Sequence, residues 1–290
     1  MSLITKEEQL QVDGLIEKLP ELVEEAKYDE LYGYQLDPKG DFYDEEVTKT
    51  LVIKFLRANK FDLELAKTQL SKTLKWRKEF NPLSAGFSED HDEKFDIISY
   101  ITWYEKNSSN EKVVTFNVYG NVTNPKDIFG DLDKFLRWRI GIMEKSIQIL
   151  NFKDPDNSSM VQLHDYKKLS FLKMDPDVKN GSKATITIFQ DYYPELLSEK
   201  FFVNIPTILS WVYLFVSRFV SEETRKKFKV LGNGTDVAKY LGDQIPKEYG
   251  GKSKQSLKEQ RFDFDNSNKE FQLSEYAAFL LSKQFTEELD

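Results

Sequence analysis

Two side chains with possible ligand chemistry, His164 and Tyr166, lie two residues apart in the segment 160–166 (MVQLHDY). The segment alternates as a β-strand does, so both side chains are expected to project from the same face. If that face lines a pocket, a tyrosinate can ligate ferric haem, a mode that requires no cysteine. A His and a Tyr that only form hydrogen bonds inside a domain have the same spacing. The spacing leaves both interpretations open.

The chain offers few other residues for catalysis or metal binding. Its 290 residues include no Cys and only two His, His91 and His164. The missing thiols exclude disulfides, thiolate-bound zinc, iron–sulfur clusters and a cysteine nucleophile, and two His residues cannot form a three-His metal site. A serine hydrolase would have to use one of these His residues, and no G-x-S-x-G motif occurs. We predict that the protein is not an enzyme.

Two D-P-D sequences and a glycine pair are the remaining candidates for ligand binding. Neither D-P-D sequence continues into a calcium loop with its Gly and terminal Glu, so both are predicted to be turns and helix caps. The glycine pair lacks the further glycines and the Lys of a phosphate loop and is predicted to be a turn. The residues concerned are Asp154, Asp156, Asp175 and Asp177, and Gly232-Asn233-Gly234.

Charge and hydropathy narrow the class of protein. With 41 Lys and Arg against 49 Asp and Glu, the formal net charge is −8, which argues against non-specific nucleic-acid binding. Aromatic residues make up 14% of a chain whose mean hydropathy is −0.55, so many of them must be buried or line a cavity. The first ten residues show no secretory signal, and the apolar segment 205–220 contains Pro206 and Arg218 and is too short to span a bilayer. We expect a cytoplasmic protein.

The first 88 residues are predicted to form a small helical module. Apolar residues recur at helical spacing until Pro20, and the Gly- and Pro-containing segment 28–41 indicates a connection. Two amphipathic helices are predicted at 48–61 and 62–80, with Asp62 as the N-cap of the second.

Beyond residue 88 the patterns alternate between strand and helix. Strands are predicted at 112–119, 160–166, 200–205 and 227–231, and a long helix at 131–150. The segment 184–193 has strand propensity, but a helix there completes the alternation, and we favour a helix. The pattern predicts an α/β domain over 89–265 with a mainly parallel sheet, followed by a C-terminal helix within 266–290.

Several short motifs, in order along residues 51–253, resemble those of the CRAL-TRIO lipid-binding family. Within that family the chain is similar to a fungal group of non-classical phosphatidylinositol transfer proteins, some of which carry haem. The motifs are Lys54-Phe55-Leu56-Arg57-Ala58-Asn59-Lys60-Phe61, Trp76-Arg77, His164-Asp165-Tyr166-Lys167, Tyr192-Tyr193-Pro194-Glu195, 227–232 and Tyr249-Gly250-Gly251-Lys252, with the run 29–34 typical of the fungal group.

The resemblance implies a CRAL-TRIO fold, in which a helical module packs on a sheet and helices enclose a hydrophobic pocket. Its mobile gate would be the segment 208–219, although periodicity alone favours a buried core helix, because apolar helix faces normally pack inward. The implied ligand is phosphatidylinositol, held at its headgroup by Glu195, Thr224 and Lys227. Without the resemblance, Lys227 is interpreted as an ordinary solvated surface lysine. Asn59 stands where the usual motif has a second arginine, and Arg57 and Lys60 remain nearby.

The haem-carrying group implies a second ligand in the same pocket, haem b. Tyr166 would be its axial ligand and the metal-binding residue, with His164 beside the iron and Arg139 and Lys200 near the propionates or the ligand tyrosinate. A cation near the Tyr166 oxygen is expected to lower its pKa. Asn59 replaces an aromatic residue that approaches the haem in that group.

The implied function is phosphatidylinositol binding and transfer between membranes in support of phosphoinositide homeostasis. The alternatives are a haem protein with a redox or oxidant-stress role and a lipid sensor that presents phosphatidylinositol to a kinase. The expected partner is a membrane surface, bound peripherally at the endoplasmic reticulum or microsomes, with neither nucleic acid nor an obligate protein partner.

Overall fold

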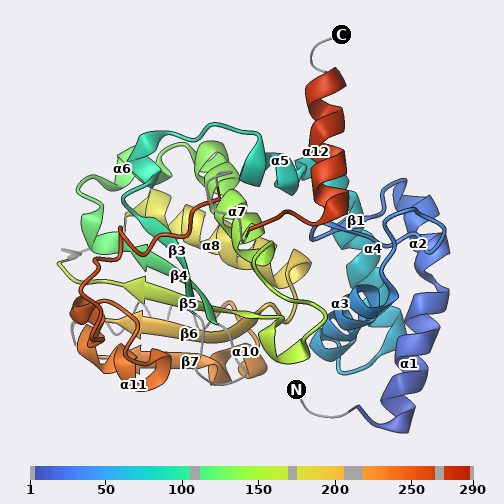
Figure 1. Ribbon diagram of the computed structural model, residues 1–290, viewed down its shortest axis with the longest axis horizontal. Coiled ribbons are helices and arrows are strands. Elements are labelled where there is room, and N and C mark those ends of the chain that lie inside the picture. The colour runs from blue at the N-terminus through green and yellow to red at the C-terminus, as the bar shows by residue number, and fades with distance from the viewer. Residues whose placement is uncertain (1–3, 105–111, 169–174, 206–217, 265–270, 288–290) are drawn as a thin grey trace.

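The computed structural model describes residues 4–104, 112–168, 175–205, 218–264 and 271–287, in which a group of helices lies beside a five-stranded sheet (Figure 1). The predicted α/β class with a mainly parallel sheet is confirmed. Within the described residues, no helix is long and apolar enough to cross a membrane. The predicted gate, 208–219, falls largely outside the described residues. The predicted domain boundaries at residues 88 and 265 stay predictions.

Five helices occupy the described N-terminal part of the chain; the first four pack on one another through apolar faces, whereas the fifth packs against α7 (Leu132–Ile147). They are α1 (Lys6–Glu17), α2 (Leu19–Ala26), α3 (Glu45–Ala58), α4 (Leu63–Phe80) and α5 (Pro82–Phe87). Asp62 accepts a hydrogen bond from the Leu65 amide at 2.9 Å, which confirms it as the N-cap of α4. The apolar side chains that the helices share, among them Leu15, Leu51 and Phe55, are fully buried.

The segment predicted as a connection contains a β-hairpin. Its strands are β1 (Glu30–Leu31) and β2 (Tyr34–Gln35), which pair antiparallel. Tyr32 and Gly33 have φ angles of 56° and 89°, as a two-residue type I′ turn requires. The sequence pattern does not predict this hairpin because its strands are only two residues long.

The sheet has the strand order β3-β4-β5-β6-β7. The strands are β3 (Ser99–Tyr104), β4 (Lys112–Val118), β5 (Met160–Asp165), β6 (Leu197–Val203) and β7 (Phe228–Leu231). The last four were predicted from sequence and pair in parallel, whereas the antiparallel edge strand β3 was not predicted.

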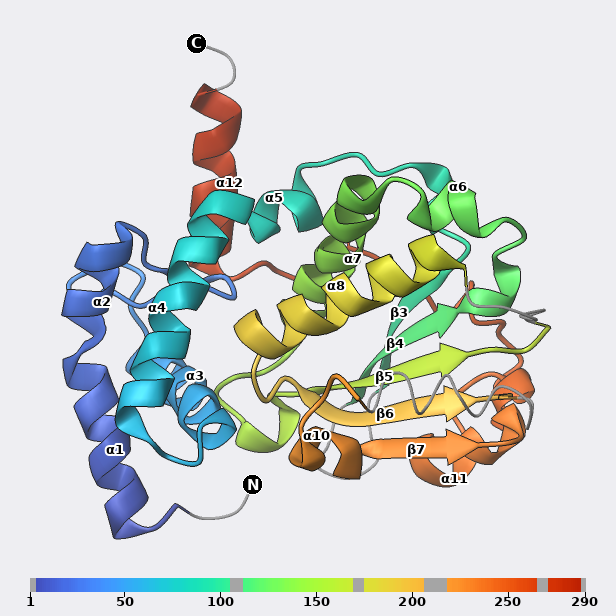
Figure 2. The same ribbon diagram turned by 180° about the vertical axis from the view of Figure 1, so that it is seen from behind.

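Long helices cover one face of the sheet (Figure 2). These are α7 (Leu132–Ile147) and α8 (Pro176–Tyr192); α8 contains most of the ambiguous segment 184–193 and confirms it as helical. On the other face, Val161 and Leu163 pack with Val237 and Leu241. The remaining helices of the described residues are α6 (Pro125–Phe129), α10 (Glu222–Lys226), α11 (Ala238–Leu241) and α12 (Glu275–Glu287), with 3₁₀ turns at Glu93–Phe95, Tyr119–Asn121, Pro155–Asn157, Gly234–Val237 and Lys247–Tyr249.

The D-P-D sequences are helix caps, as predicted. Asp154 accepts from the Asp156 amide at 3.0 Å at the start of a 3₁₀ turn. Asp175 accepts from the Asp177 amide at 2.8 Å and begins α8. The C-terminal helix predicted within 266–290 is α12, which contacts α5 (Figure 1).

Candidate functional site

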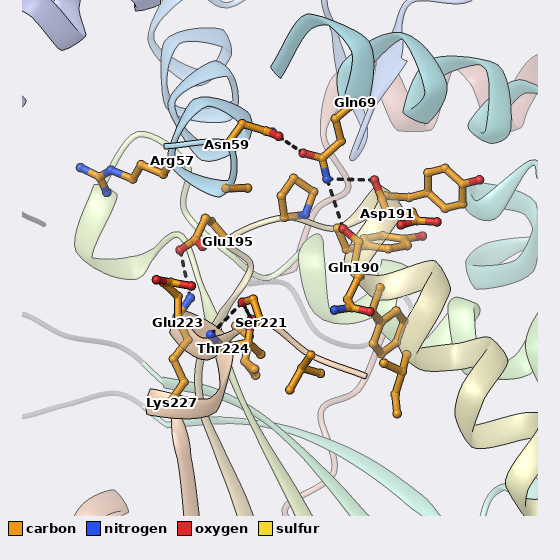
Figure 3. Close-up of a pocket in the computed structure, with 18 of the residues that line it drawn as sticks. Arg57, Asn59, Gln69, Gln190, Asp191, Glu195, Ser221, Glu223, Thr224 and Lys227 are labelled. Carbon is orange, nitrogen blue, oxygen red and sulfur yellow. Dashed lines mark hydrogen bonds and ion pairs between the residues drawn. The ribbon is translucent and has the colours of Figure 1, made fainter. Parts of the chain in front are cut away.

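A cavity of about 670 Å³ opens between the end of α3, the end of α8 and α10 (Figure 3). Arg57, Asn59 and Lys60 line its mouth from the α3 side. From there the lining runs inward to Gln162 on β5 and Lys200 on β6. Its volume lies within the range of pockets that hold small molecules.

The three predicted headgroup residues meet at this cavity. The Glu195 carboxylate pairs with the Lys227 ammonium at 2.9 Å, and both side chains are partly exposed. Thr224 lines the same cavity. Ser221, the N-cap of α10, accepts from the Thr224 amide at 3.1 Å. A carboxylate, an ammonium group and a hydroxyl group therefore face one opening, where they can receive polyol hydroxyls and a phosphate (Figure 3).

Asn59 takes part in a chain of amide hydrogen bonds. Its Nδ2 donates to Gln69 Oε1 at 2.6 Å, and Gln69 Nε2 donates to the carbonyls of Gln190 and Asp191 at 3.1 Å each. These hydrogen bonds link the α3–α4 corner to the end of α8 (Figure 3). Asn59 therefore helps to hold the α3–α4 corner against the end of α8, whereas an arginine at this position would add a positive charge.

The predicted haem residues lie deeper, on the sheet face covered by α7 and α8. His164 and Tyr166 share this face, as predicted: the ring centroid of Tyr119 is 5.5 Å from that of His164 and 5.6 Å from that of Tyr166. The Phe202 ring lies 5.7 Å from His164 and 6.4 Å from Tyr166. Arg139 reaches the same region from α7, where its guanidinium lies 5.1 Å from the Phe189 ring.

The region around His164 and Tyr166 contains two cationic side chains, Arg139 and Lys200, that have no acidic partner among the described residues. No carboxylate in the part of the chain that the structure describes acts on Arg139 or Lys200, and Arg139 Nη1 and His164 Nε2 are buried within the described residues without a hydrogen-bond partner. Lys200 keeps partial access to the cavity, yet its surroundings desolvate it and, with the Arg139 charge, lower its pKa to about 7. Burial, then Lys200 and Arg139, lower the pKa of His164 well below its ordinary value.

The prediction that a nearby cation lowers the pKa of Tyr166 is wrong. Burial raises the pKa of Tyr166 well above its ordinary value, and the neighbouring Tyr119 raises it further. No described cation is among the causes of the shift, so nothing opposes the effect of burial on the phenol. In the part of the chain that the structure describes, no cluster of three or more His, Asp or Glu side chains is suited to hold a metal ion.

The sequence patterns did not predict that a buried lysine, Lys54, contacts the backbone of this site. Lys54 on α3 is 1% exposed and donates to the Glu195 carbonyl at 3.0 Å and to Ser158 Oγ at 3.1 Å. The available signal was a single lysine within the apolar run LVIKFL, where a solvated lysine is not expected.

Comparisons with known proteins identify the family of this chain. The CRAL/TRIO domain family matches residues 98–251, and the CRAL/TRIO N-terminal domain family matches residues 27–72. The chain belongs to the CRAL-TRIO family. The predicted family and fold are thereby confirmed.

Fungal proteins are similar over nearly the whole chain. "Phosphatidylinositol transfer protein SFH5" of Kluyveromyces lactis is 52% identical over 232 residues, covering 80% of this CRAL-TRIO chain and 78% of the relative. The protein of the same name from Saccharomyces cerevisiae is 41% identical over 288 residues, with 96% of both chains covered. The crystal structure of Sfh5 superposes with a TM-score of 0.90 at 40% identity and covers 99% of this chain and all of that one. These names are those of lipid transfer proteins, in agreement with the prediction that this protein is not an enzyme.

Proposed function

We propose that this protein binds phosphatidylinositol and carries it between membranes. The observation that carries the proposal is the Glu195–Lys227 pair beside Thr224, at the mouth of a cavity whose wall continues into apolar residues such as Phe189 and Phe228. The names of the similar fungal proteins support the same ligand.

The headgroup and the acyl chains of phosphatidylinositol would contact different parts of the cavity. Hydroxyls of the inositol ring can donate to Glu195, while Lys227 and Thr224 can donate to the phosphodiester oxygens. The acyl chains would enter the cavity, so that enclosure avoids the hydrophobic cost of crossing water. The protein must touch a bilayer to exchange lipid, and we propose peripheral, transient contact with membranes of the endoplasmic reticulum or microsomes, without an obligate protein partner. Support of phosphoinositide homeostasis would follow from such exchange, whether the lipid is released to a membrane or presented to a kinase.

Transfer of labelled phosphatidylinositol between vesicles tests the proposal. Lys227→Ala and Glu195→Ala are each expected to reduce transfer about tenfold or more, because each removes a charge-assisted contact to the headgroup. Neither side chain is in the core, so the unfolding midpoint should stay close to that of the unaltered protein.

Lys229→Ala is the matched control. Lys229 pairs with Glu199 at 3.3 Å with similar side-chain exposure, but it does not line the cavity. The control is expected to transfer normally. Equal transfer by the Lys227→Ala and Lys229→Ala variants would contradict the headgroup assignment.

A specific observation favours haem b as a second ligand, in the buried region next to Lys200 at the inner end of this cavity. Arg139 Nη1 and His164 Nε2 are buried and unpaired within the described residues, next to Lys200 and Tyr166. This donor set fits a group that carries carboxylates and accepts an oxygen ligand: Arg139 and Lys200 would hold the propionates, Tyr166 would be the axial ligand and His164 would lie beside it. Haem, when bound, supplies iron chemistry of its own.

The ultraviolet–visible spectrum of the purified protein tests this second function. We expect a Soret band that shifts or disappears in Tyr166→Phe and persists in Tyr119→Phe, since Tyr119 shares the face without the proposed role. Lys200 and the headgroup residues line one cavity, so added phosphatidylinositol should compete with hemin uptake. A colourless protein that takes up no added hemin would exclude the haem role.

A further inference from the structure

The ammonium group of Lys54 lies beneath the Glu195–Lys227 pair. It donates to the Glu195 carbonyl at 3.0 Å and to Ser158 Oγ at 3.1 Å, and neither acceptor carries a charge. Ser158 is 1% exposed and donates in turn to the Pro155 carbonyl at 2.9 Å. Burying a lysine without a carboxylate in direct contact is costly, so simple packing favours an apolar residue at this position.

The electrostatics of Lys54 are linked to those of the cavity mouth. Burial lowers the pKa of Lys54 to about 7, the Glu195 charge opposes this shift, and Lys227 and Arg57 reinforce it. The charged groups at the mouth therefore act on Lys54 although it does not reach the cavity itself.

The backbone that Lys54 contacts is in an unfavourable conformation. Glu195 has a φ of 54°, in the left-handed region that residues other than Gly, Asn and Asp seldom adopt. Such a conformation persists only where neighbouring contacts hold it. Side chains from the N-terminal half of the chain donate hydrogen bonds to four carbonyls of the segment that ends at Glu195. The donor–acceptor pairs are Gln69 with Gln190 and Asp191, Tyr32 with Tyr192, and Lys54 with Glu195.

We propose that Lys54 is a positioning residue for the headgroup site, and that it acts through the backbone of Glu195. By holding the Glu195 carbonyl, Lys54 fixes the direction in which the carboxylate leaves the turn, toward Lys227 and Thr224. It thereby sets the preference of the site for a phosphodiester that carries a polyhydroxyl headgroup. This inference rests on the proposed function, because it concerns the same site.

A double-mutant cycle in the full chain tests the proposal. The variants are Lys54→Met, Glu195→Gln and the double variant, and the measurement is the partition of labelled phosphatidylinositol between phosphatidylcholine vesicles and protein. Each single variant is expected to lower affinity about tenfold. The double variant should be no weaker than Glu195→Gln alone, because residues that act as one unit are not additive.

Ser158→Ala is the matched control. It removes the other acceptor of the same ammonium group and leaves the contact with Glu195, so phosphatidylinositol affinity should stay close to that of the unaltered protein. An equal loss of affinity in Ser158→Ala would show that Lys54 acts by general packing and would overturn the proposal.

The remaining outcomes separate this proposal from the proposed function. If Glu195→Gln lowers affinity but Lys54→Met has no effect or an additive one, the positioning role is wrong and the headgroup site stands. If Glu195→Gln has no effect, the headgroup site itself is wrong, and the positioning role with it. If Lys54→Met does not fold, Lys54→Arg takes its place in the cycle. Its effect on affinity must then vanish in the Glu195→Gln background, and an effect that persists overturns the proposal.

Discussion

Replacing Arg77 with Leu is expected to lower the free energy of unfolding by about 3–5 kcal/mol, because it leaves two buried carboxylates without their cation. Arg77 lies on α4 and is fully buried. Its guanidinium contacts Glu30 at 2.7 Å and Glu144 at 2.8 Å, and both acidic side chains are also fully buried. Burial alone would lower the pKa of Arg77, but Glu144 and Glu30 together raise it well above its ordinary value.

The surroundings of this triad explain why the loss should be large. The hydroxyls of Tyr28 and Tyr193 donate to Glu30 at 3.1 Å and to Glu144 at 2.6 Å, and the Tyr32 ring lies 5.1 Å from the guanidinium. The network joins the β1–β2 hairpin and α4 to α7 and to the segment that follows α8. Its removal should therefore loosen the N-terminal helices from the sheet domain.

Urea unfolding followed by circular dichroism checks this prediction. Lys252→Ala is the control, since Lys252 pairs with Asp243 at 2.6 Å on the surface, and the midpoint should not change. A loss below about 1 kcal/mol in Arg77→Leu would show that the two carboxylates find other partners or bind protons without cost.

Raising the pH from 7 to 9 is expected to stabilise the protein without ligand by about 2 kcal/mol for each of two lysines. Burial of Lys54 and desolvation of Lys200 lower the pKa of both from 10.5 to about 7. Between these values the unfolded chain binds more protons than the folded chain, so the free energy of unfolding rises with pH. Below pH 7 both lysines are charged in both states, and their desolvation cost is fully present.

Urea unfolding at pH 7, 8 and 9 measures this slope. Lys200→Met should reduce the slope by about half and raise stability at pH 7, because it removes one desolvated charge. Lys229→Ala should leave the slope unchanged, since Lys229 pairs with Glu199 outside the cavity. A flat profile in the unaltered protein would mean that both lysines keep ordinary pKa values.

Much of the fold could be read from local patterns. Alternation and β-branched residues identified the segments that become β4 to β7, and helical periodicity identified α4 and α7. Strand β3 was missed although it pairs with β4 along its full length, from Ser99 with Asn117 to Tyr104 with Lys112. The β1–β2 hairpin was missed because two-residue strands carry no period.

The order of the motifs in the sequence indicated the family, the alternation of strand and helix patterns predicted the parallel sheet, and the family resemblance implied the grouping of Glu195, Thr224 and Lys227. Only the tertiary structure decided which polar groups are paired. Lys54 and Glu195 lie 141 positions apart, and Arg77 and Glu144 lie 67 apart, so no local pattern relates them. The tertiary structure also left Arg139 Nη1 and His164 Nε2 without a hydrogen-bond partner within the described residues. The physical reason is that desolvation depends on which distant segments cover a side chain, whereas periodicity depends only on neighbours along the chain.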